Sequence, residues 1–466
     1  MSSEPTRHAD QMSDLEALMW HLEQDPRLSS NVANLSILDC APDRERLRDT
    51  MVRAASVFPR LRQRVQPVMG RLAPPLWEID PEFDIDRHLR WERLSGTRSR
   101  AELHRFVAAR FAEPFDRSHP LWEFVVIEGL RDGRCAMLQR IHHTITDGEG
   151  GLRLSLEFLD FERRPTPRSA IHAVDPSVAG ALRPLGSVGT ALSSMARKNL
   201  DLARKAVEGT ARTMAHPNEW AAASAEAVGL ARATIRQAQV GDRPLSPLWT
   251  ERSLDHWFGT LDVDFDRARS AAKRLGGTLN DLFVTGACLG AGAYHREHGT
   301  PVAALRMAMP ISSRSDHSIG GNVFAPTQLS VPADDVDPAV LFTRVHHALA
   351  TVKGESTLGV TDALAAVVNF LPMFMVRGAG QRVAGSIDFV TSNLRAAPMD
   401  MFLAGALIES NYPLGPVANT AFNLTTMSYR GSFCMGLQVD TAAISDPELL
   451  RSGLVEAYRA LLKATA

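Results

Sequence analysis

Ile141-His142-His143-Thr144-Ile145-Thr146-Asp147-Gly148 is the stretch that decides the fold and the chemistry of this chain. It closes an apolar run that is typical of a buried β-strand, and a segment with helical spacing follows it. Neighbouring side chains on a strand point to opposite faces, so His142 and His143 are not expected to share one role. Gly148 suits a tight turn into the helix, and Asp147 lies close enough to fix that turn.

A histidine in such a turn has the properties of a general base. The imidazole has a reference pKa of about 6.5, and an alcohol that attacks a thioester needs a base to take the hydroxyl proton. The tetrahedral intermediate needs hydrogen-bond donors, whereas a thiolate leaves readily without a metal. A second pair, His346-His347, lies in a helical pattern with no Asp-Gly after it, and we interpret this pair as structural.

A histidine pair followed by an aspartate can also bind a metal ion, which would make the protein a metallohydrolase using His142, His143 and Asp147. Opposite faces argue against two neighbouring histidines holding one ion. No further cluster of histidine or cysteine lies nearby in the sequence, and the four cysteines form no Cys-x-x-Cys pair. The sequence therefore favours a site without a metal.

Hydrophobic periodicity predicts mixed helices and strands in two halves. In the first half we expect helices at residues 13–22, 44–57, 100–111 and 150–161, and a hairpin with strands at 124–130 and 135–143. In the second half we expect strands at 257–263, 305–310, 323–331, 387–393, 402–410, 421–429 and 433–441. Helices are expected at 266–275, 338–352, 361–377 and 445–463, and a further helix opens at 278–281. This pattern predicts an α/β protein with two sandwich-like domains, residues 1–165 and 251–466.

The segment between the halves, residues 166–250, is rich in Ala, Ser and Arg and is expected to be a helical crossover connector. Helices are predicted at Asn199–Thr213 and Trp220–Gln239. A charged helix face is usually solvated, and the alternative is an amphipathic helix that lies on a membrane surface.

Composition excludes several classes of protein. The 466 residues carry 51 basic and 53 acidic side chains, so the net charge of -2 provides no global field for nucleic acid or anionic lipid, although a local basic patch fits these numbers. The first eleven residues lack the apolar core of a secretory signal, and no run reaches the ~20 apolar residues of a spanning helix. A cytoplasmic protein is expected, with at most peripheral contact with a membrane or lipid droplet.

The run from His142 to Gly148 matches the His-His-x-x-x-Asp-Gly motif of the coenzyme-A-dependent acyltransferase superfamily, which includes chloramphenicol acetyltransferase and the condensation domains of peptide synthetases. Further segments resemble the bacterial wax ester synthase/diacylglycerol acyltransferase family and follow its order from about residue 12 to 460: Pro120-Leu121-Trp122, Asn280-Asp281, Met309-Pro310-Ile311-Ser312 with Gly321-Asn322, Ser392-Asn393, and Tyr412-Pro413-Leu414-Gly415-Pro416. The superfamily's Asp-Phe-Gly-Trp-Gly signature is absent, which favours this branch over chloramphenicol acetyltransferase and leaves the oxyanion donor unassigned.

The resemblance implies a fold of two chloramphenicol-acetyltransferase-like α/β sandwiches with an active-site tunnel at their interface. It implies that His143 is the general base. His142, Asp147 and Gly148 would hold the loop and orient the imidazole.

The resemblance also implies substrate-binding residues. Pro120, Leu121 and Trp122 would shape the acyl pocket, and packing in the core is the alternative role for Trp122. Asn280 and Asp281 would support the site or line the channel. Ser312 and Asn280 are candidates for the oxyanion donor.

The implied activity is that of an O-acyltransferase. It would move a long-chain acyl group from acyl-CoA to diacylglycerol or a long-chain alcohol and form triacylglycerol or wax ester. Acyl-CoA is then a substrate, and no cofactor is expected. The alternatives are another hydroxyl acceptor, such as a polyketide or glycolipid, and a non-catalytic protein that binds acyl-CoA or lipid.

Overall fold

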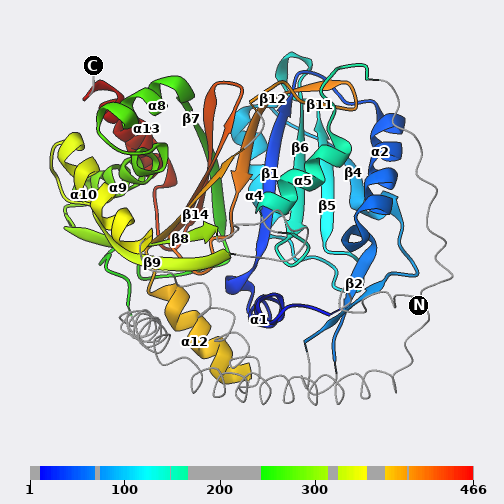
Figure 1. Cartoon of the computed structure of the whole chain (residues 1–466), viewed down its shortest axis with the longest axis horizontal. Helices are drawn as coiled ribbons and strands as arrows, with labels where there is room; N and C mark the ends of the chain where they lie inside the picture. The colour runs from blue at the N-terminus through cyan, green and yellow to red at the C-terminus, as the bar shows by residue number, and fades with distance from the viewer. Residues whose placement is uncertain are drawn as a thin grey trace, which may run out of the picture.

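The computed structural model describes residues 11–68, 74–146, 148–165, 243–312, 324–353, 373–395 and 398–464. Within these residues two six-stranded sheets lie beside each other, and helices cover the outer face of each (Figure 1). A third cluster of apolar side chains joins strands of both sheets to a helix that packs between them, α4 (Arg100–Ala112). The predicted α/β class with two sandwich-like halves is confirmed.

The first sheet has the strand order β11-β12-β1-β6-β5-β4. Its strands are β1 (Asn31–Leu38), β4 (Leu89–Arg93), β5 (Trp122–Glu128), β6 (Cys135–His142), β11 (Phe402–Leu403) and β12 (Ala406–Leu414). The helices of this half, besides α4, are α1 (Asp14–Leu22), α2 (Arg44–Val57), α3 (Ile85–His88) and α5 (Gly148–Phe158). A separate antiparallel ribbon contains β2 (Gln63–Gln66) and β3 (Leu76–Ile79).

The second sheet has the strand order β7-β14-β13-β10-β8-β9. Its strands are β7 (His256–Asp264), β8 (Ala304–Ser312), β9 (Phe324–Pro332), β10 (Phe389–Arg395), β13 (Phe422–Tyr429) and β14 (Ser432–Asp440). Its helices are α8 (Phe265–Arg274), α9 (Leu279–Glu297), α10 (Pro338–Lys353), α12 (Met373–Gly385) and α13 (Pro447–Lys463). Strand β10 runs parallel to both β8 and β13, whereas the other pairs in this sheet are antiparallel.

Local signals in the sequence predict most of these elements. Helix α1 begins with a capping box in which Ser13 and Glu16 each bond the other's backbone N–H, at 2.8 and 3.2 Å. Helix α2 has the predicted bounds, and the hairpin of β5 and β6 lies where it was expected. The expected helix at 361–377 lies partly outside the described residues, and α12 begins at Met373.

Strand β1 was not predicted, although it lies at the centre of the first sheet between β12 and β6. Polar residues at Asn34 and Ser36 weaken its hydrophobic pattern. Both side chains find a partner on β12, because the Oδ1 atom of Asn411 accepts a bond from Ser36 Oγ at 2.6 Å and from Asn34 Nδ2 at 3.0 Å. The partner is distant in sequence, so local periodicity does not reveal the strand.

Strand β12 comes from the C-terminal half of the chain but completes the first sheet, with Ala33 opposite Leu414. It also packs closely on β14 of the second sheet. A Cβ atom placed on Gly436 would lie 2.0 Å from the carbonyl oxygen of Pro413, so only glycine permits this approach. Strand β12 therefore holds the two sheets together, an arrangement that the predicted division at residue 251 did not include.

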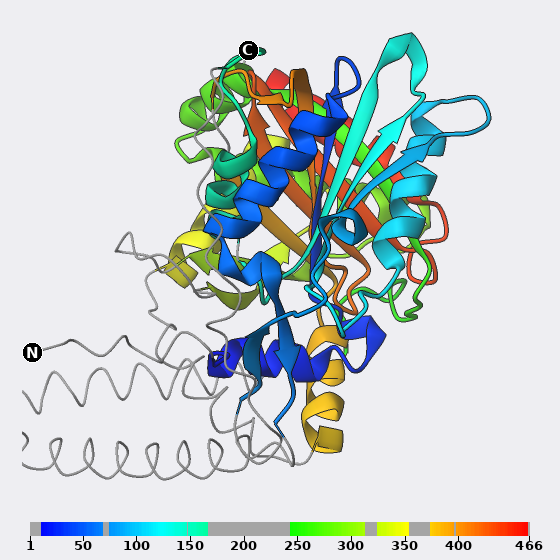
Figure 2. The same cartoon turned by 90° about the vertical axis from the view of Figure 1, so that its right-hand side faces the viewer.

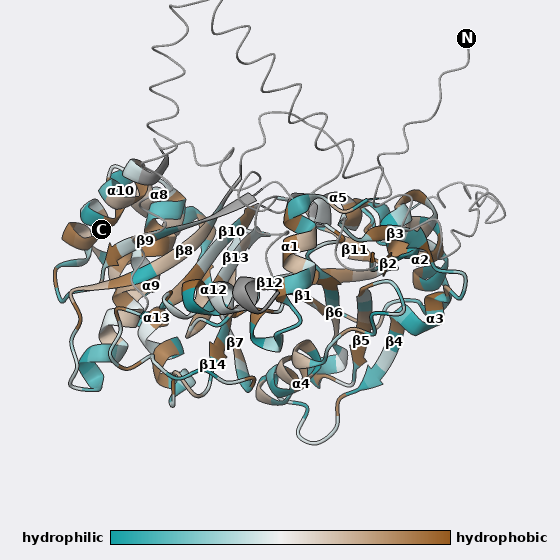
Figure 3. Cartoon of the chain, turned by 90° about the horizontal axis from the view of Figure 1, so that it is seen from below, coloured by the Kyte–Doolittle hydropathy of each residue, from teal (hydrophilic) through white to brown (hydrophobic). Residues whose placement is uncertain are grey.

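The apolar strands lie inside the molecule, and hydrophilic stretches lie on helices and loops (Figure 3). Each sheet has its own core cluster on the face that its outer helices cover. In the part of the chain that the structure describes, no helix combines the length and apolarity needed to cross a membrane. The helices predicted within the connector, Asn199–Thr213 and Trp220–Gln239, lie outside the described residues.

Candidate active site

Three chain segments meet at the end of β6. The backbone N–H of His142 donates to the carbonyl oxygen of Leu121 at 2.9 Å, and that of His143 donates to Ser30 at 3.0 Å. The N–H of Ile145 then returns to the carbonyl of His142 at 2.9 Å. The histidine pair is thereby fixed between the loop that precedes β1 and the segment that begins β5.

The side chain of His142 is buried, with 1% of the residue exposed. Its Nδ1 atom accepts a hydrogen bond from the backbone N–H of Thr144 at 3.1 Å and lies 2.7 Å from the hydroxyl of the same residue. Because Nδ1 is an acceptor, the proton of the neutral ring lies on Nε2. That nitrogen donates to the carboxylate of Glu23.

Glu23 follows helix α1 and is held by several groups besides His142. Its carboxylate accepts a bond from the Ser29 hydroxyl at 3.0 Å and forms an ion pair with Arg117 at 3.3 Å. Arg117 in turn lies over the ring of Trp20, 4.1 Å from its centroid. Burial raises the pKa of the Glu23 carboxyl, but the bond to His142 and the charge of Arg117 outweigh it, so the pKa is lowered.

Sequence reasoning did not identify Glu23. A glutamate at the end of an amphipathic helix is usually solvated, and nothing in the local pattern distinguishes it from its neighbours. Its partner His142 is 119 positions away in the sequence. Only the fold, through the pairing of Asn31 on β1 with His142 on β6, brings the two together.

His143 lies just beyond the end of β6 and is partly exposed, whereas His142 is enclosed. The two neighbours therefore occupy different environments, as expected for consecutive residues at a strand end. Gly148 is the first residue of α5. Asp147, which was expected to fix the turn, lies outside the described residues.

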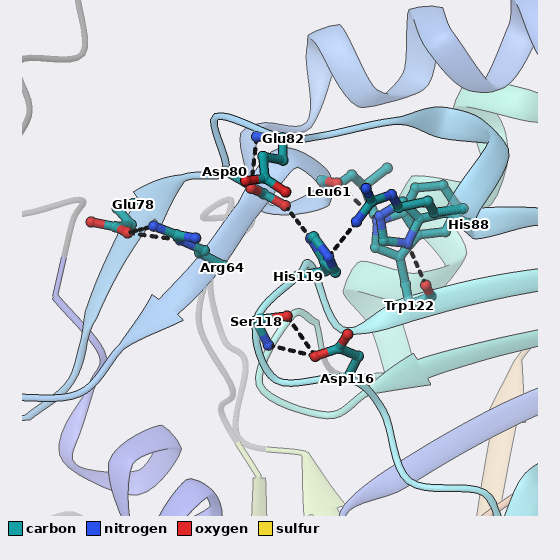
Figure 4. A network of polar contacts seen from close by, with 11 residues as sticks. Leu61, Arg64, Glu78, Asp80, Glu82, His88, Asp116, Ser118, His119 and Trp122 are labelled. Carbon is teal, nitrogen blue, oxygen red and sulfur yellow. Dashed lines mark hydrogen bonds and ion pairs between the residues drawn. The ribbon is translucent and has the colours of Figure 1, made fainter.

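The segment Pro120-Leu121-Trp122 leads into β5, and all three residues are buried. The indole of Trp122 stacks on His88 with 4.6 Å between ring centroids, and its Nε1 donates to the carbonyl of Leu61 at 2.8 Å. Figure 4 shows this indole beside the ring of His88. The contacts place Trp122 in the core of the first half, which favours packing over the acyl-pocket role.

A polar network fixes the chain just before this segment (Figure 4). The Nδ1 atom of His119 bonds the buried carboxylate of Asp80 at 2.8 Å. One residue earlier in the same loop, the backbone N–H of Ser118 donates to the carboxylate of Asp116 at 2.9 Å. The network therefore positions the loop whose Leu121 carbonyl receives the His142 N–H.

In the second half, Asp281 is 2% exposed and takes part in the capping box of α9. Its Oδ2 atom accepts bonds from the Thr278 N–H at 2.7 Å and from Nδ1 of His346 at 2.8 Å. His346 belongs to the pair interpreted as structural, and its bond to Asp281 is a structural contact of this kind. Asp281 therefore has partners that fix the start of a helix.

The two other predicted residues of the second half lie on neighbouring elements. The Oδ1 atom of Asn280 accepts a hydrogen bond from Asn393 on β10 at 3.3 Å. Ser312 is the last residue of β8 and pairs in register with Phe324. The hydrogen bonds recorded for Asn280 tie it to the second sheet, so its predicted role toward substrate stays a prediction, as does that of Ser312.

Among the described residues, no group of three or more His, Cys, Asp or Glu side chains is arranged to hold a metal ion. The metallohydrolase alternative also needs Asp147, which the structure does not describe. In its place, the described part of the site contains a carboxylate–imidazole pair behind a more exposed imidazole. This arrangement suits proton transfer at His143.

Family models match most of the chain. The model described as the wax ester synthase/diacylglycerol acyltransferase catalytic domain matches residues 12–283, and the WS/DGAT C-terminal domain matches residues 320–462. A Mycobacterium tuberculosis (strain H37Rv) protein, named as a candidate diacylglycerol O-acyltransferase, is 31% identical over 472 residues. The match covers 99% of this chain and 93% of that protein.

Solved structures share the fold. The wax ester synthase/diacylglycerol acyltransferase from Marinobacter aquaeolei VT8 superposes with a TM-score of 0.66 at 19% identity, covering 98% of this chain and 100% of its own. The first condensation domain of the calcium-dependent antibiotic synthetase superposes with a TM-score of 0.61 at 14% identity, covering 99% and 97%. The expected chloramphenicol-acetyltransferase-like architecture of two sandwiches is thereby confirmed.

Proposed function

Because the chain belongs to the wax ester synthase/diacylglycerol acyltransferase family and is an acyltransferase, we propose that it acylates diacylglycerol or a long-chain alcohol. The donor in this proposal is long-chain acyl-CoA, and the products are free CoA and triacylglycerol or wax ester. The observation that carries the proposal is the contrast between the two histidines. His142 is committed to Glu23 and Thr144, whereas His143 is partly exposed beside it.

The proposed reaction is a direct transfer with His143 as general base. The imidazole takes the proton of the acceptor hydroxyl, and the oxygen attacks the thioester carbonyl carbon. The tetrahedral intermediate collapses, the carbon–sulfur bond breaks, and the protonated imidazole returns the proton to the CoA thiolate. Protons and electrons balance without a cofactor or a covalent acyl-enzyme.

The residues around His143 act in this proposal by orientation. The backbone of His142 is bonded to Leu121, and its ring is bonded to Thr144 and Glu23, so the strand end cannot rotate freely. A fixed base is worth several powers of ten in rate, because misplacement by about 1 Å costs ~100-fold. Asp147 and Gly148 would close the same turn on the other side.

Substrates would approach His143 through a tunnel between the two halves. The close contact of β12 with β14 joins these two halves. Asn280 and Ser312 are the candidate donors to the oxyanion, and Asp281 supports Asn280 by fixing the start of α9. Pro120 and Leu121 would shape the acyl side, with the Leu121 carbonyl as the direct link to His142.

A product assay tests the proposal. Purified protein is incubated with palmitoyl-CoA and an equal mixture of hexadecanol and dipalmitoylglycerol, CoA release is followed, and the lipids are separated. We expect wax ester or triacylglycerol, and a loss of about 100- to 10,000-fold in His143→Ala. His347→Ala is the matched control, because His347 also follows a histidine but is exposed on α10.

The outcomes separate the alternatives. Product that vanishes in His143→Ala but persists in His347→Ala supports the proposal and identifies the preferred acceptor. A near-normal rate in His143→Ala would remove His143 from the mechanism. Folded protein that binds palmitoyl-CoA but releases no CoA with either acceptor would point to another hydroxyl or to a binding role.

A further inference from the structure

A hollow of about 550 Å³ lies at the end of the first sheet opposite to the histidine pair. Cys135, the first residue of β6, borders it, whereas His142 ends the same strand about 23 Å away. The end of β4, the loop that follows it and the turn between β5 and β6 form its walls. Figure 2 shows these two loops projecting from the molecule at the upper right.

Arginine dominates the lining of this hollow. Arg93, Arg98, Arg131 and Arg134 line it, together with two acidic residues. All four arginines are exposed at the surface. This concentration of positive charge is local, because the whole chain carries a net charge of -2.

Two charged residues of the lining form ion pairs with residues outside the hollow. Glu128 is paired with Arg44 on α2 at 3.0 Å, and Arg134 is paired with Glu409 on β12 at 3.2 Å. Within the described parts of the chain, the guanidinium groups of Arg93, Arg98 and Arg131 have no acidic partner. Three positive charges therefore face the hollow against one exposed carboxylate, Asp132.

The backbone holds these arginines in place. Arg131 donates from Nε to the carbonyl of Thr97 at 3.2 Å, which ties the hairpin turn to the loop after β4. Gly129 has a φ of 86°, and a Cβ atom there would lie 3.4 Å from Cγ and 3.7 Å from Nε of Arg93. The stem of Arg93 therefore lies against a residue that has no side chain. The three guanidinium groups that have no acidic partner among the described residues are presented from two loops that this bond connects.

We propose that this hollow binds phosphate groups displayed by an anionic lipid surface. Guanidinium groups form paired hydrogen bonds with phosphate oxygens, and three of them converge here with little competition from carboxylates. The protein has no global positive field, so attraction to such a surface must come from a local group of this kind. The two loops project beyond the helices around them and can meet a flat surface (Figure 2).

The inference goes beyond the proposed function and is read out by binding, so failure of the acyltransfer assay would not affect it. Full-length protein is mixed with vesicles of phosphatidylcholine alone or with added phosphatidylglycerol, and the bound fraction is measured by flotation. The double variant Arg93→Gln, Arg98→Gln removes two guanidinium groups that bond no other side chain in the described part of the protein, so we expect the fold to be retained. Adding Arg131→Gln gives the triple variant.

The matched control is Arg267→Gln, Arg269→Gln, Lys273→Gln, which removes three exposed positive charges from α8 in the second half. We expect wild type and control to prefer the vesicles that contain phosphatidylglycerol. An arginine near such a surface contributes roughly a fivefold factor, so we expect the triple variant to bind about 100-fold more weakly and the double about 25-fold. Thermal melting verifies folding of each variant.

Three results would overturn the inference. The first is equal binding of wild type to both kinds of vesicle, and the second is equal loss of binding in the triple variant and the control. The third is displacement of the protein from vesicles by inorganic phosphate or CoA beyond the effect of sodium chloride at the same ionic strength. That third result would assign the hollow to a soluble phosphate compound.

Discussion

Nε2 of His142 donates its hydrogen bond to the carboxylate of Glu23, a residue from the end of α1 that the sequence motif does not include. This bond joins the first helix of the described chain to the strand end where the proposed base lies. His142 is buried and Glu23 is partly buried, and Arg117 balances the charge of the carboxylate. The proposed reaction therefore depends on a residue more than a hundred positions away from the motif.

Replacing Glu23 is expected to reduce both stability and turnover. Glu23→Ala leaves His142 and the partly exposed Arg117 without their shared acceptor, which costs about 1–3 kcal/mol of unfolding free energy. Turnover should fall roughly 100-fold, because the strand end that carries His143 loses its support. Denaturant unfolding and CoA release under the same conditions measure the two effects.

Glu23→Gln is the control for this change. It keeps an acceptor oxygen and the same shape, so most of the stability should return, and turnover should lie between those of wild type and Glu23→Ala. Wild-type turnover in folded Glu23→Ala would show that the bond does not position His143.

The pH dependence of stability should contain a contribution from His104 on α4. Burial lowers the pKa of His104 to about 3, against a usual value near 6.5. Between these values the unfolded chain binds a proton that the folded chain does not, so stability is fully present above pH 6.5 and falls as the pH decreases. The slope from this one group is about 1.4 kcal/mol per pH unit.

His104→Gln removes this titration and keeps a polar group near Thr260, which lies 3.4 Å from the ring. The unfolding free energies of wild type and variant are measured from pH 7 to pH 4. As the pH decreases, the unfolding free energy of wild type should fall more steeply than that of the variant. Other buried histidines contribute equally to both proteins and cancel. Parallel curves would contradict the assignment.

Gly436→Ala is expected to weaken the junction of the two halves. Its Cβ atom would lie 2.0 Å from the Pro413 carbonyl oxygen, and backbone cannot move aside as a side chain does. We expect a loss of about 1–3 kcal/mol, or more, of unfolding free energy. Gly378→Ala is the control, because no atom of the described residues lies within 4 Å of its added Cβ, and helix α12 should gain up to about 1 kcal/mol. Equal stability of the two variants would show that the sheets separate readily.

Trp122→Phe distinguishes core packing from a role in the acyl pocket. The change removes the indole N–H that bonds Leu61 and should cost about 1–3 kcal/mol of stability, with the preference for acyl chain length unchanged. Trp77→Phe is the matched control, because Trp77 is also buried but its indole nitrogen has no hydrogen-bond partner among the described residues. A shifted chain-length preference with normal stability would assign Trp122 to the pocket.

Local signals predicted much of the fold, because capping and periodicity are written in neighbouring residues. The capping box at Ser13 and the turn residues between β5 and β6 are examples of this. Partners distant in sequence explain what was not predicted. Strand β1 depends on Asn411 to satisfy its polar side chains, and the sheet to which β12 belongs is decided by contacts that no local pattern contains.

The candidate site shows the same limit. The motif indicated His142 and His143 and their separate environments, because strand geometry alone predicts opposite faces. The hydrogen bond from Thr144 that sets the tautomer of His142, and the carboxylate of Glu23, follow only from the folded chain. Asp281 is expected to support the site, and the structure adds its partner His346, whose bond to this helix-capping residue agrees with a structural role.

The crossing of β12 into the first sheet has a consequence for synthesis on the ribosome. Residues 31–142 can form the inner strands early, but the edge of β1 stays open until residues 406–414 have emerged. An open edge of a central strand pairs readily with other chains, so the nascent protein passes through a stage that is vulnerable to aggregation. A fragment that ends at residue 165 would stay at that stage permanently, and adding the 398–464 segment in trans should rescue its solubility.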